Sequence, residues 1–247
     1  MIELDRIYNQ DCLEGMRQIP DGSIDAVICD LPYGTTYCSW DTVIPMDELW
    51  AQYKRIVKPG GRILLFGQVP FFAVVVTSNL AWFNGEWIWV KEKGFGFVNA
   101  EKCPLRCHEN IAVFTKPNGS PTYNPQKTKG EPYKHRIARQ ADHYDIEDPG
   151  YIVKEYDGMR YPNDVLFYGR ERGTFHPTQK PVDLLRYLVL TYTNEGDTVL
   201  DNCMGSGTTA IACIKEKRHF IGFELSKEYF DKAQRRIKAE QAQLTLF

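Results

Sequence analysis

The sequence predicts an α/β protein with one doubly wound, mostly parallel sheet. Short apolar segments alternate along the chain with segments of helical periodicity, which is the pattern of a parallel sheet covered by helices on both faces. Two of the apolar segments also end in an acidic residue beside a turn. The chain has 247 residues, 43% of them hydrophobic and 25% charged, which suffices for one core and a smaller appendage.

The individual elements follow from the apolar periodicity. Six buried strands are predicted, at residues 24–29, 62–66, 87–90, 111–115, 198–200 and 220–223. Three helices are predicted, at residues 46–57, 181–191 and 228–238. Residues 117–174 differ, because they are rich in Pro, Gly, Tyr, Lys and Arg and show little periodicity. We expect them to form an irregular insertion that divides one domain into residues 1–116 and 175–247.

Charge and cysteine content narrow the function classes. The formal net charge of -2 gives no global attraction to a polyanion, so nucleic-acid binding would need a local basic face. Seven cysteines at irregular spacing, with no leader-like start, argue against a secreted disulfide framework, so we expect reduced thiols and a cytoplasmic or nucleoid-associated protein. The longest apolar stretch, residues 69–76, is too short to span a bilayer, so no membrane association is expected.

The first candidate site is the stretch ICDLPYGTTYCSWD, residues 28–41. Here a predicted apolar strand runs directly into Asp30, Pro32 and Tyr33. A carboxylate and an aromatic ring beside a rigid proline suit a flat, polar group that is held where the strand ends.

The second candidate site is TVLDNCMGSGTTAIACIKEKRHFIGFEL, residues 198–225. A strand ends in Asp201, Gly205-Ser206-Gly207 opens a helix, and the next strand ends in Glu224, 19 residues after Gly205. Glycines allow the backbone to approach a ligand closely, and a carboxylate can accept both hydroxyls of a ribose. The glycines alone could simply make a tight turn, but the two acidic residues favour a nucleoside site. Nicotinamide cofactors would satisfy the same residues.

Together the two stretches resemble the beta-class amino methyltransferases of DNA, which methylate adenine N6 or cytosine N4 with S-adenosylmethionine. The family motifs D-P-P-Y and F-x-G-x-G correspond to Asp30-Leu31-Pro32-Tyr33 and Cys203-Met204-Gly205-Ser206-Gly207. The match continues through residues 9–12, 108–110 and 176–181, and the catalytic motif precedes the cofactor loop, a permuted order. The resemblance therefore implies a Rossmann-like methyltransferase sheet, with residues 1–116 as its catalytic half and 175–247 as its cofactor-binding half.

The resemblance implies catalytic roles for the first motif. Asp30 and the main-chain oxygen of Leu31 would accept the two hydrogens of the target amino group, so that its lone pair points at the methyl group. Tyr33 would stack on the base, which must be flipped out of the duplex, and Pro32 would stiffen the turn. The chain departs from the family pattern at Leu31, where Pro is usual, and at Asn202-Cys203, where Pro-Phe is usual.

The resemblance also implies a cofactor site. Glu224 would bind the ribose, the backbone of 205–208 the methionine portion, Asp11 and Cys12 the adenine, and Thr178 and Lys180 the methionine carboxylate. The predicted cofactor-binding residues are Asp11, Cys12, Asp30, Thr178, Lys180, Asp201, Gly205, Ser206, Gly207, Thr208 and Glu224. His176 fits a structural role as well as a ligand contact.

A local basic face lies in the insertion. Its predicted DNA-binding residues are Lys127, Lys129, Lys134, Arg136 and Arg139, with Tyr133 and His135 between them. In the family this position holds the target-recognition region.

We therefore predict a site-specific DNA adenine-N6 methyltransferase that uses S-adenosylmethionine and double-stranded DNA, without a metal. The Asp at the first motif position favours adenine N6 as the methyl acceptor, with cytosine N4 as the alternative and glutamine side chains of proteins as a more remote one. Two other classes of protein remain open: a catalytically silent DNA-binding protein and a dinucleotide-dependent oxidoreductase. Cys103 and Cys107 lack a second pair of ligands for zinc. Family members often dimerise, so a homodimer is an expectation, and restriction-modification is the expected context.

Overall fold

The computed structural model describes residues 2–34, 42–138, 151–171 and 178–244. The chain separates into two compact units. Unit 1 consists of Met1–Asn124 with Asp164–Phe247, and unit 2 of Pro125–Asn163.

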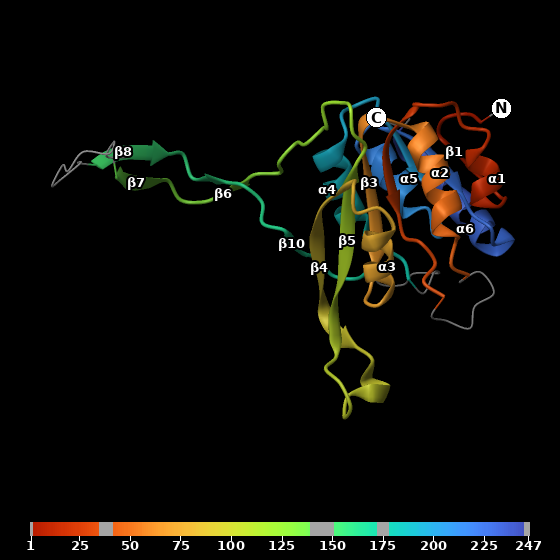
Figure 1. The fold of residues 1–247 in the computed structure, drawn as a ribbon, viewed down its shortest axis with the longest axis horizontal. Helices are drawn as coiled ribbons and strands as arrows, with labels where there is room; N and C mark the ends of the chain where they lie inside the picture. The colour runs from red at the N-terminus through yellow and green to blue at the C-terminus, as the bar shows by residue number, and fades with distance from the viewer. Residues whose placement is uncertain (1, 35–41, 139–150, 172–177, 245–247) are drawn as a thin grey trace. The chain divides into compact units, whose positions relative to one another are not determined.

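The described part of unit 1 is built on a sheet of eight strands (Figure 1). In sheet order they are β1 (Arg6–Tyr8), β12 (His219–Phe223), β11 (Thr198–Asp201), β2 (Ile24–Cys29), β3 (Val57–Gly67), β5 (Arg106–Thr115), β4 (Phe83–Phe95) and β10 (Val165–Phe167). All neighbours are parallel except β5, which is antiparallel to both β3 and β4. Each of the six predicted strands lies within one of these strands, which confirms the mostly parallel sheet.

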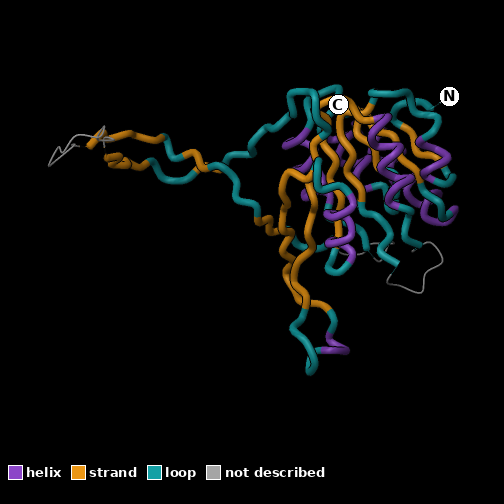
Figure 2. Tube along the Cα trace, in the orientation of Figure 1, coloured by secondary structure: helices purple, strands orange, loops and turns teal. Residues whose placement is uncertain are grey.

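Helices cover both faces of this sheet, as a doubly wound fold requires (Figure 2). One face packs against α1 (Cys12–Met16), α2 (Met46–Ile56) and α3 (Phe71–Ser78), in a core that contains Met16, Leu49 and Val75. The other face packs against α4 (Val182–Tyr192), α5 (Thr208–Lys215) and α6 (Lys227–Leu244), in a core that contains Leu188 and Ile237. The starts of the three predicted helices are confirmed to within one residue, and α6 continues beyond its predicted end.

The topology brings the two candidate motifs together. β11, from the end of the chain, pairs with β2, from its beginning, with Val199 opposite Ala26 and Leu200 opposite Val27. Because β2, β11 and β12 are parallel, their carboxyl ends meet at one edge of the sheet. Asp30, Asp201 and Glu224 therefore lie at the same edge.

Unit 2 contains two short antiparallel ladders that the sequence did not predict. β6 (Thr128–Lys129) pairs with β9 (Met159–Arg160), and β7 (Tyr133–Ala138) pairs with β8 (Tyr151–Tyr156). In the second ladder the rings of Tyr133 and Tyr156 stack across the strands, with centroids 4.8 Å apart. The unit is shorter than the irregular insertion expected at residues 117–174, and its described residues include these two antiparallel strand pairs. The two flanking halves stay a prediction.

None of the helices in the described ranges combines the length and the apolar character that crossing a membrane requires.

Candidate functional site

A cavity of about 570 Å³ lies at the carboxyl edge of the sheet of unit 1. Both ends of the chain contribute to its wall. The predicted site residues that line it are Asp11, Cys12, Asp30, Leu31, Pro32, Tyr33, Thr178, Lys180, Asp201, Gly205, Ser206, Thr208 and Glu224. The structure thus gathers the two motifs, 170 residues apart in sequence, around one space.

Gly207 is placed differently from the other predicted cofactor residues. It is not among the residues that line the cavity, and a Cβ there would lie 3.3 Å from Ala233 and Ile237 of α6. Its φ of +78 also lies in the left-handed region, where a side chain is strained. The conformation of the turn therefore favours glycine at this position, and the cofactor contact of Gly207 stays a prediction.

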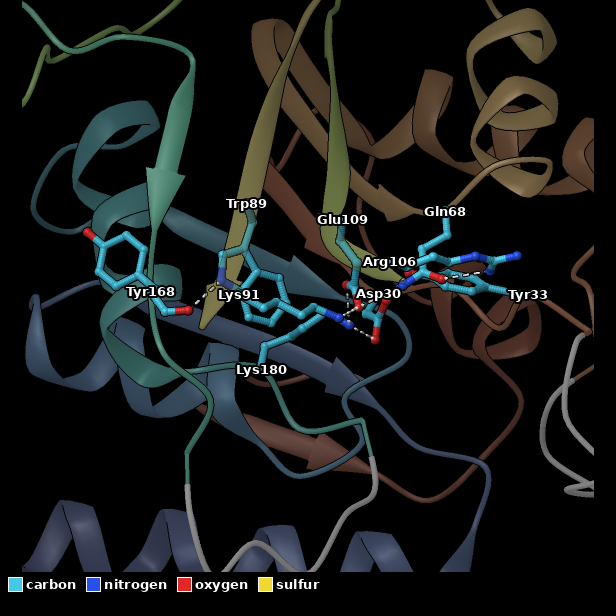
Figure 3. Close-up of polar contacts among 9 residues, drawn as sticks. All are labelled: Asp30, Tyr33, Gln68, Trp89, Lys91, Arg106, Glu109, Tyr168 and Lys180. Carbon is cyan, nitrogen blue, oxygen red and sulfur yellow. Dashed lines mark hydrogen bonds and ion pairs between the residues drawn. The ribbon is translucent and has the colours of Figure 1, made fainter. Parts of the chain in front are cut away.

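A buried cluster of opposite charges lies in the cavity beside the first motif (Figure 3). Lys180 Nζ lies 2.5 Å from Asp30 Oδ2 and 3.2 Å from Glu109 Oε2. Lys91, from β4, forms an ion pair with the same Glu109, which is on β5. The side chains of Lys180 and Glu109 are each 9% exposed, whereas Asp30 keeps 24% of its side-chain surface. Asp30 is thus the member of the cluster that a ligand reaches most readily.

The electrostatics assign a protonation state to each member of the cluster. Burial raises the pKa of Asp30, although the Lys180 ammonium acts to lower it. Burial acts on Glu109 in the same direction, but Lys180 and Lys91 outweigh it, so the pKa of Glu109 is lowered. Burial acts to lower the pKa of Lys180, yet Asp30 and Glu109 raise it to about 12. Lys180 and Glu109 are therefore charged at neutral pH, and Asp30 is the carboxyl most easily protonated.

Tyr33 is hydrogen-bonded to the Asp30 carboxylate of this cluster. Its hydroxyl donates a hydrogen bond of 2.8 Å to Asp30 Oδ1, and its ring stacks on Phe71 with centroids 4.9 Å apart. Burial raises the pKa of Tyr33 well above its usual value, so the hydroxyl remains a donor. The ring is thereby fixed at the cavity wall beside the carboxylate.

Two aromatic rings lie near the Lys180 ammonium, and an amide donates to its partner Glu109. Lys180 Nζ lies 5.2 Å from the ring centroid of Phe66 and 6.0 Å from that of Trp89. Gln68 Nε2 donates to Glu109 Oε1 over 3.2 Å. Glu109, Lys91 and Gln68 received no role from the sequence, although Glu109 lies in the segment 108–110 that matches the family.

The opposite end of the cavity is formed by the glycine turn and Glu224. Gly205 N and Ser226 N each donate a 2.8 Å hydrogen bond to a different carboxylate oxygen of Glu224. Burial raises the pKa of this carboxyl group. Each oxygen can accept a further hydrogen bond, so a ligand hydroxyl can still be bound.

Asp201 and Asp11 use oxygens to hold the local backbone. Thr209 Oγ1 donates to Asp201 Oδ2 over 2.6 Å and Cys203 N donates to Asp201 Oδ1 over 3.1 Å, so this carboxylate fixes the glycine turn. Burial raises the pKa of Asp201 to about 6. Asp11 Oδ1 accepts hydrogen bonds from the first amides of α1 and acts as its N-cap.

The basic residues predicted to bind DNA belong to unit 2. Lys127, Lys129, Lys134 and Arg136 are exposed, while Arg139 lies outside the described residues, as does His176 of unit 1. Lys127 Nζ lies 4.2 Å above the ring of Tyr161. Lys134 forms an exposed ion pair with Glu155, which offsets part of its charge.

Comparisons with known proteins identify the family of the chain. The model of the N6/N4 DNA methylase family, described as DNA methylase, matches residues 24–235. The chain is 30% identical to the Type II methyltransferase M.BglII of Bacillus subtilis, over 96% of this chain and 70% of that protein. It is 27% identical to the Type II methyltransferase M.HpaI of Haemophilus parainfluenzae, over 95% of this chain and 74% of that protein.

Solved structures share the fold over almost the whole chain. The crystal structure of the M1.HpyAVI-SAM complex is 25% identical, with a TM-score of 0.65 over 94% of this chain and 98% of that one. The cytosine-N4-specific PvuII DNA methyltransferase is 16% identical and shows the fold alone, with a TM-score of 0.65 over 95% of this chain and 90% of that one. The family match and the relatives lead to one conclusion: the chain belongs to the N6-adenine/N4-cytosine DNA methyltransferases.

Proposed function

We propose that this DNA methyltransferase transfers the methyl group of S-adenosylmethionine to N6 of a flipped adenine in duplex DNA. One observation carries the proposal: Asp30 and Leu31 line the same cavity as the glycine turn and Glu224. A carboxylate acceptor for an amino group and a carboxylate acceptor for a ribose thus face one enclosed space. Methyl transfer requires this proximity of donor and acceptor.

The cavity suits the proposed cofactor in size and chemistry. Its volume of about 570 Å³ is in the range of small-molecule sites. Glu224 would accept the ribose hydroxyls, and the turn of Gly205 and Ser206 would approach the methionine portion with its backbone. When bound, the cofactor supplies an electrophilic methyl group on sulfur. The residues of the chain bind it, orient it and exclude water.

Asp30 would act on the target amino group as an acceptor. Its carboxylate and the main-chain oxygen of Leu31 would take the two amino hydrogens, which localises the nitrogen lone pair toward the methyl group. This role requires an ionised Asp30, although burial raises the pKa of that carboxyl. Lys180, 2.5 Å away, would maintain the ionised form. The position of Lys180 favours this role over the predicted contact with the methionine carboxylate.

Unit 2 would supply the DNA contacts. Its described residues contain six Lys or Arg and only three Asp or Glu. The basic residues are Lys127, Lys129, Lys134, Arg136, Lys154 and Arg160, and the acidic ones are Glu131, Glu155 and Asp157. A two-stranded ribbon such as β7–β8 fits the major groove, and its basic side chains would contact phosphates. The cytoplasmic location and the homodimer stay predictions.

The choice of adenine rests on Asp30 at the first motif position. Labelled S-adenosylmethionine and unmethylated genomic DNA, followed by nucleoside analysis and modification-sensitive sequencing, test the reaction, the base and the target sequence together. We expect N6-methyladenine in one sequence context. N4-methylcytosine would overturn the choice of base, and the absence of label from DNA would overturn the proposed reaction.

Glu224→Gln should weaken the binding of S-adenosylmethionine. Each oxygen of the Glu224 carboxylate can accept from a backbone N–H and from a ribose hydroxyl, whereas the NH2 group of Gln cannot accept a hydrogen bond. A hydrogen bond to a charged group contributes about 1.5–3 kcal/mol. We expect the Kd to rise about tenfold or more by calorimetry. The matched control Glu228→Gln, an exposed residue of α6 outside the cavity, should leave the Kd unchanged. An unchanged Kd for Glu224→Gln would remove this residue from the site.

Replacing the basic residues of unit 2 should weaken DNA binding in a salt-dependent way. With Lys127, Lys129 and Arg136 changed to Ala, the slope of log affinity against log salt should fall by about 0.9 for each phosphate that the variant no longer neutralises. Binding of S-adenosylmethionine should be unaffected. A slope identical to that of the wild type would show that these side chains do not contact phosphates.

A further inference from the structure

A β-hairpin protrudes from the edge of the sheet that carries the site (Figure 1). β4 runs to Phe95 and β5 starts at Arg106, and residues 96–105 connect them through the short 3-10 helix η1 (Phe97–Asn99). β4 has the same direction as β3, because both are antiparallel to β5. The connection therefore extends beyond the carboxyl edge, where Asp30 also lies.

The tip of this hairpin is folded by its own backbone and presents two apolar side chains to water. Asn99 N donates to Gly96 O and Lys102 N donates to Asn99 O, each over 2.9 Å. Phe97 is 70% exposed and Val98 is 97% exposed. The apolar side chains are not needed to hold the turn, and their exposure is unfavourable in water. Adjacent exposed apolar residues on a protrusion are typical of a contact surface.

The charge of the hairpin favours DNA as the partner. Residues 91–106 contain four basic residues and two acidic ones. The basic residues are Lys91, Lys93, Lys102 and Arg106, and the acidic ones are Glu92 and Glu101. Lys93, Lys102 and Arg106 are exposed. A basic stem attracts phosphates, and an apolar tip can enter the base stack as a wedge.

The hairpin is long enough to reach the bases of a duplex whose target nucleotide occupies the cavity. Its stem begins in the site, because Lys91 forms an ion pair with the cavity residue Glu109. From Lys91 to the end of β4 at Phe95 the strand rises about 13 Å, and the 3-10 turn that carries Phe97 and Val98 lies beyond that point. The major groove is about 8.5 Å deep. The tip can thus pass the backbone and reach the base stack.

We propose that Phe97 and Val98 pack into the duplex next to the target nucleotide and stabilise its flipped-out position. The proposal rests on DNA methylation by this site and not on the choice between adenine and cytosine. The hairpin would act by favouring the opened base pair, while the cavity binds the extruded base. A substrate whose target is already unpaired should not need it.

The double substitution Phe97→Ser with Val98→Ser tests this role in the full chain. The substrates are two duplexes that contain the target sequence, one fully paired and one with an abasic site opposite the target nucleotide. We expect the variant to lose at least tenfold in kcat/KM on the paired duplex and less than threefold on the abasic one. The Kd for S-adenosylmethionine should stay within twofold. Leu80→Ser is the matched control, since Leu80 is 63% exposed and precedes β4 at the opposite edge of the sheet.

The outcomes separate this proposal from its rivals. Equal losses on both duplexes would overturn it, because the tip would then act on something other than base opening. An unchanged kcat/KM on the paired duplex would also overturn it, and would point to a protein partner for the tip. A wild type that transfers no methyl group would contradict the proposed reaction. The hairpin would then be tested by the affinity of wild type and variant for each duplex. We expect the variant to bind the paired duplex more weakly than the wild type does and to bind the abasic duplex equally well.

Discussion

Replacing Asp30 with Ala is expected to abolish most methyl transfer while S-adenosylmethionine still binds. The carboxylate is the polarising acceptor of the proposed reaction, and removing one such preorganised group typically costs about 10² to 10³ in rate. The protein should still fold, because Lys180 keeps Glu109 as an ion-pair partner at 3.2 Å. Single-turnover transfer of labelled methyl measures the rate, and calorimetry measures the cofactor Kd, which should change less than about threefold.

The isosteric variant Asp30→Asn separates charge from volume. It keeps the shape of the side chain but removes the negative charge that Lys180 faces, so it should be nearly as slow as Asp30→Ala. Asp21→Ala is the control, because Asp21 is an exposed carboxylate whose side chain is 77% accessible and which precedes β2 at the opposite edge. A rate for Asp30→Ala within tenfold of the wild type would reject this carboxylate as the acceptor.

Replacing Lys180 with Met is expected to move the acid limb of the kcat profile to higher pH. Lys180 lowers the pKa of Asp30 against the effect of burial, so its loss raises that pKa further. Only the ionised form accepts the amino hydrogens, and a close opposite charge typically shifts a carboxyl pKa by about 1–3 units. We therefore expect the midpoint of the acid limb to rise by about 1–3 pH units. The pH dependence of kcat at saturating cofactor measures it.

The same substitution should also destabilise the protein in a pH-dependent way. Removing one partner of a buried ion pair costs about 3–5 kcal/mol. The folded pKa of Asp30 is already raised above its ordinary value, so its ionised form opposes folding at high pH. In Lys180→Met the loss of stability should thus be greatest above this raised pKa and smaller at acidic pH, where Asp30 takes up a proton. Thermal unfolding at several pH values measures this.

Lys91→Met is the matched control for these effects. Lys91 is nearly as buried as Lys180, with 10% of its side chain exposed, but it pairs with Glu109 and not with Asp30. The acid limb of the kcat profile of Lys91→Met should move much less than that of Lys180→Met. If Lys180 instead holds the methionine carboxylate, Lys180→Met will raise the cofactor Kd and leave the acid limb in place at saturation. That result would contradict the role assigned to Lys180 here.

Much of the fold could be predicted because a parallel sheet buries both faces of its strands. The apolar runs at 24–29 and 198–200 are continuous for this reason. The family resemblance predicts that Asp30 and the glycine turn lie close together, and the pairing of β2 with β11 accounts for this proximity. β1 and β10 were missed because each has only three residues. The longer ladder of unit 2 was missed because the side chains that the structure describes in its strands, at 133–136 and 152–156, are exposed on both faces, so these segments need no apolar period.

The polar interior of the site could not be predicted from the sequence. Glu109 and Lys91 meet because β5 pairs with β4, and this register is not encoded by any local motif. A lysine near a cofactor site suits a ligand carboxylate as well as a protein one. The choice of Lys180 between them depends on its burial beside Asp30. The sequence motif also gives no sign that a side chain at position 207 would meet Ala233 and Ile237 of α6.

The most direct test of the central claim is a crystal structure with S-adenosylhomocysteine and a duplex that contains the target sequence. We expect the ribose hydroxyls to contact Glu224, and the amino group of a flipped base to contact Asp30 and the main-chain oxygen of Leu31, within one cavity. A cofactor bound away from Glu224, or a target base that remains stacked or lies far from Asp30, would contradict this claim.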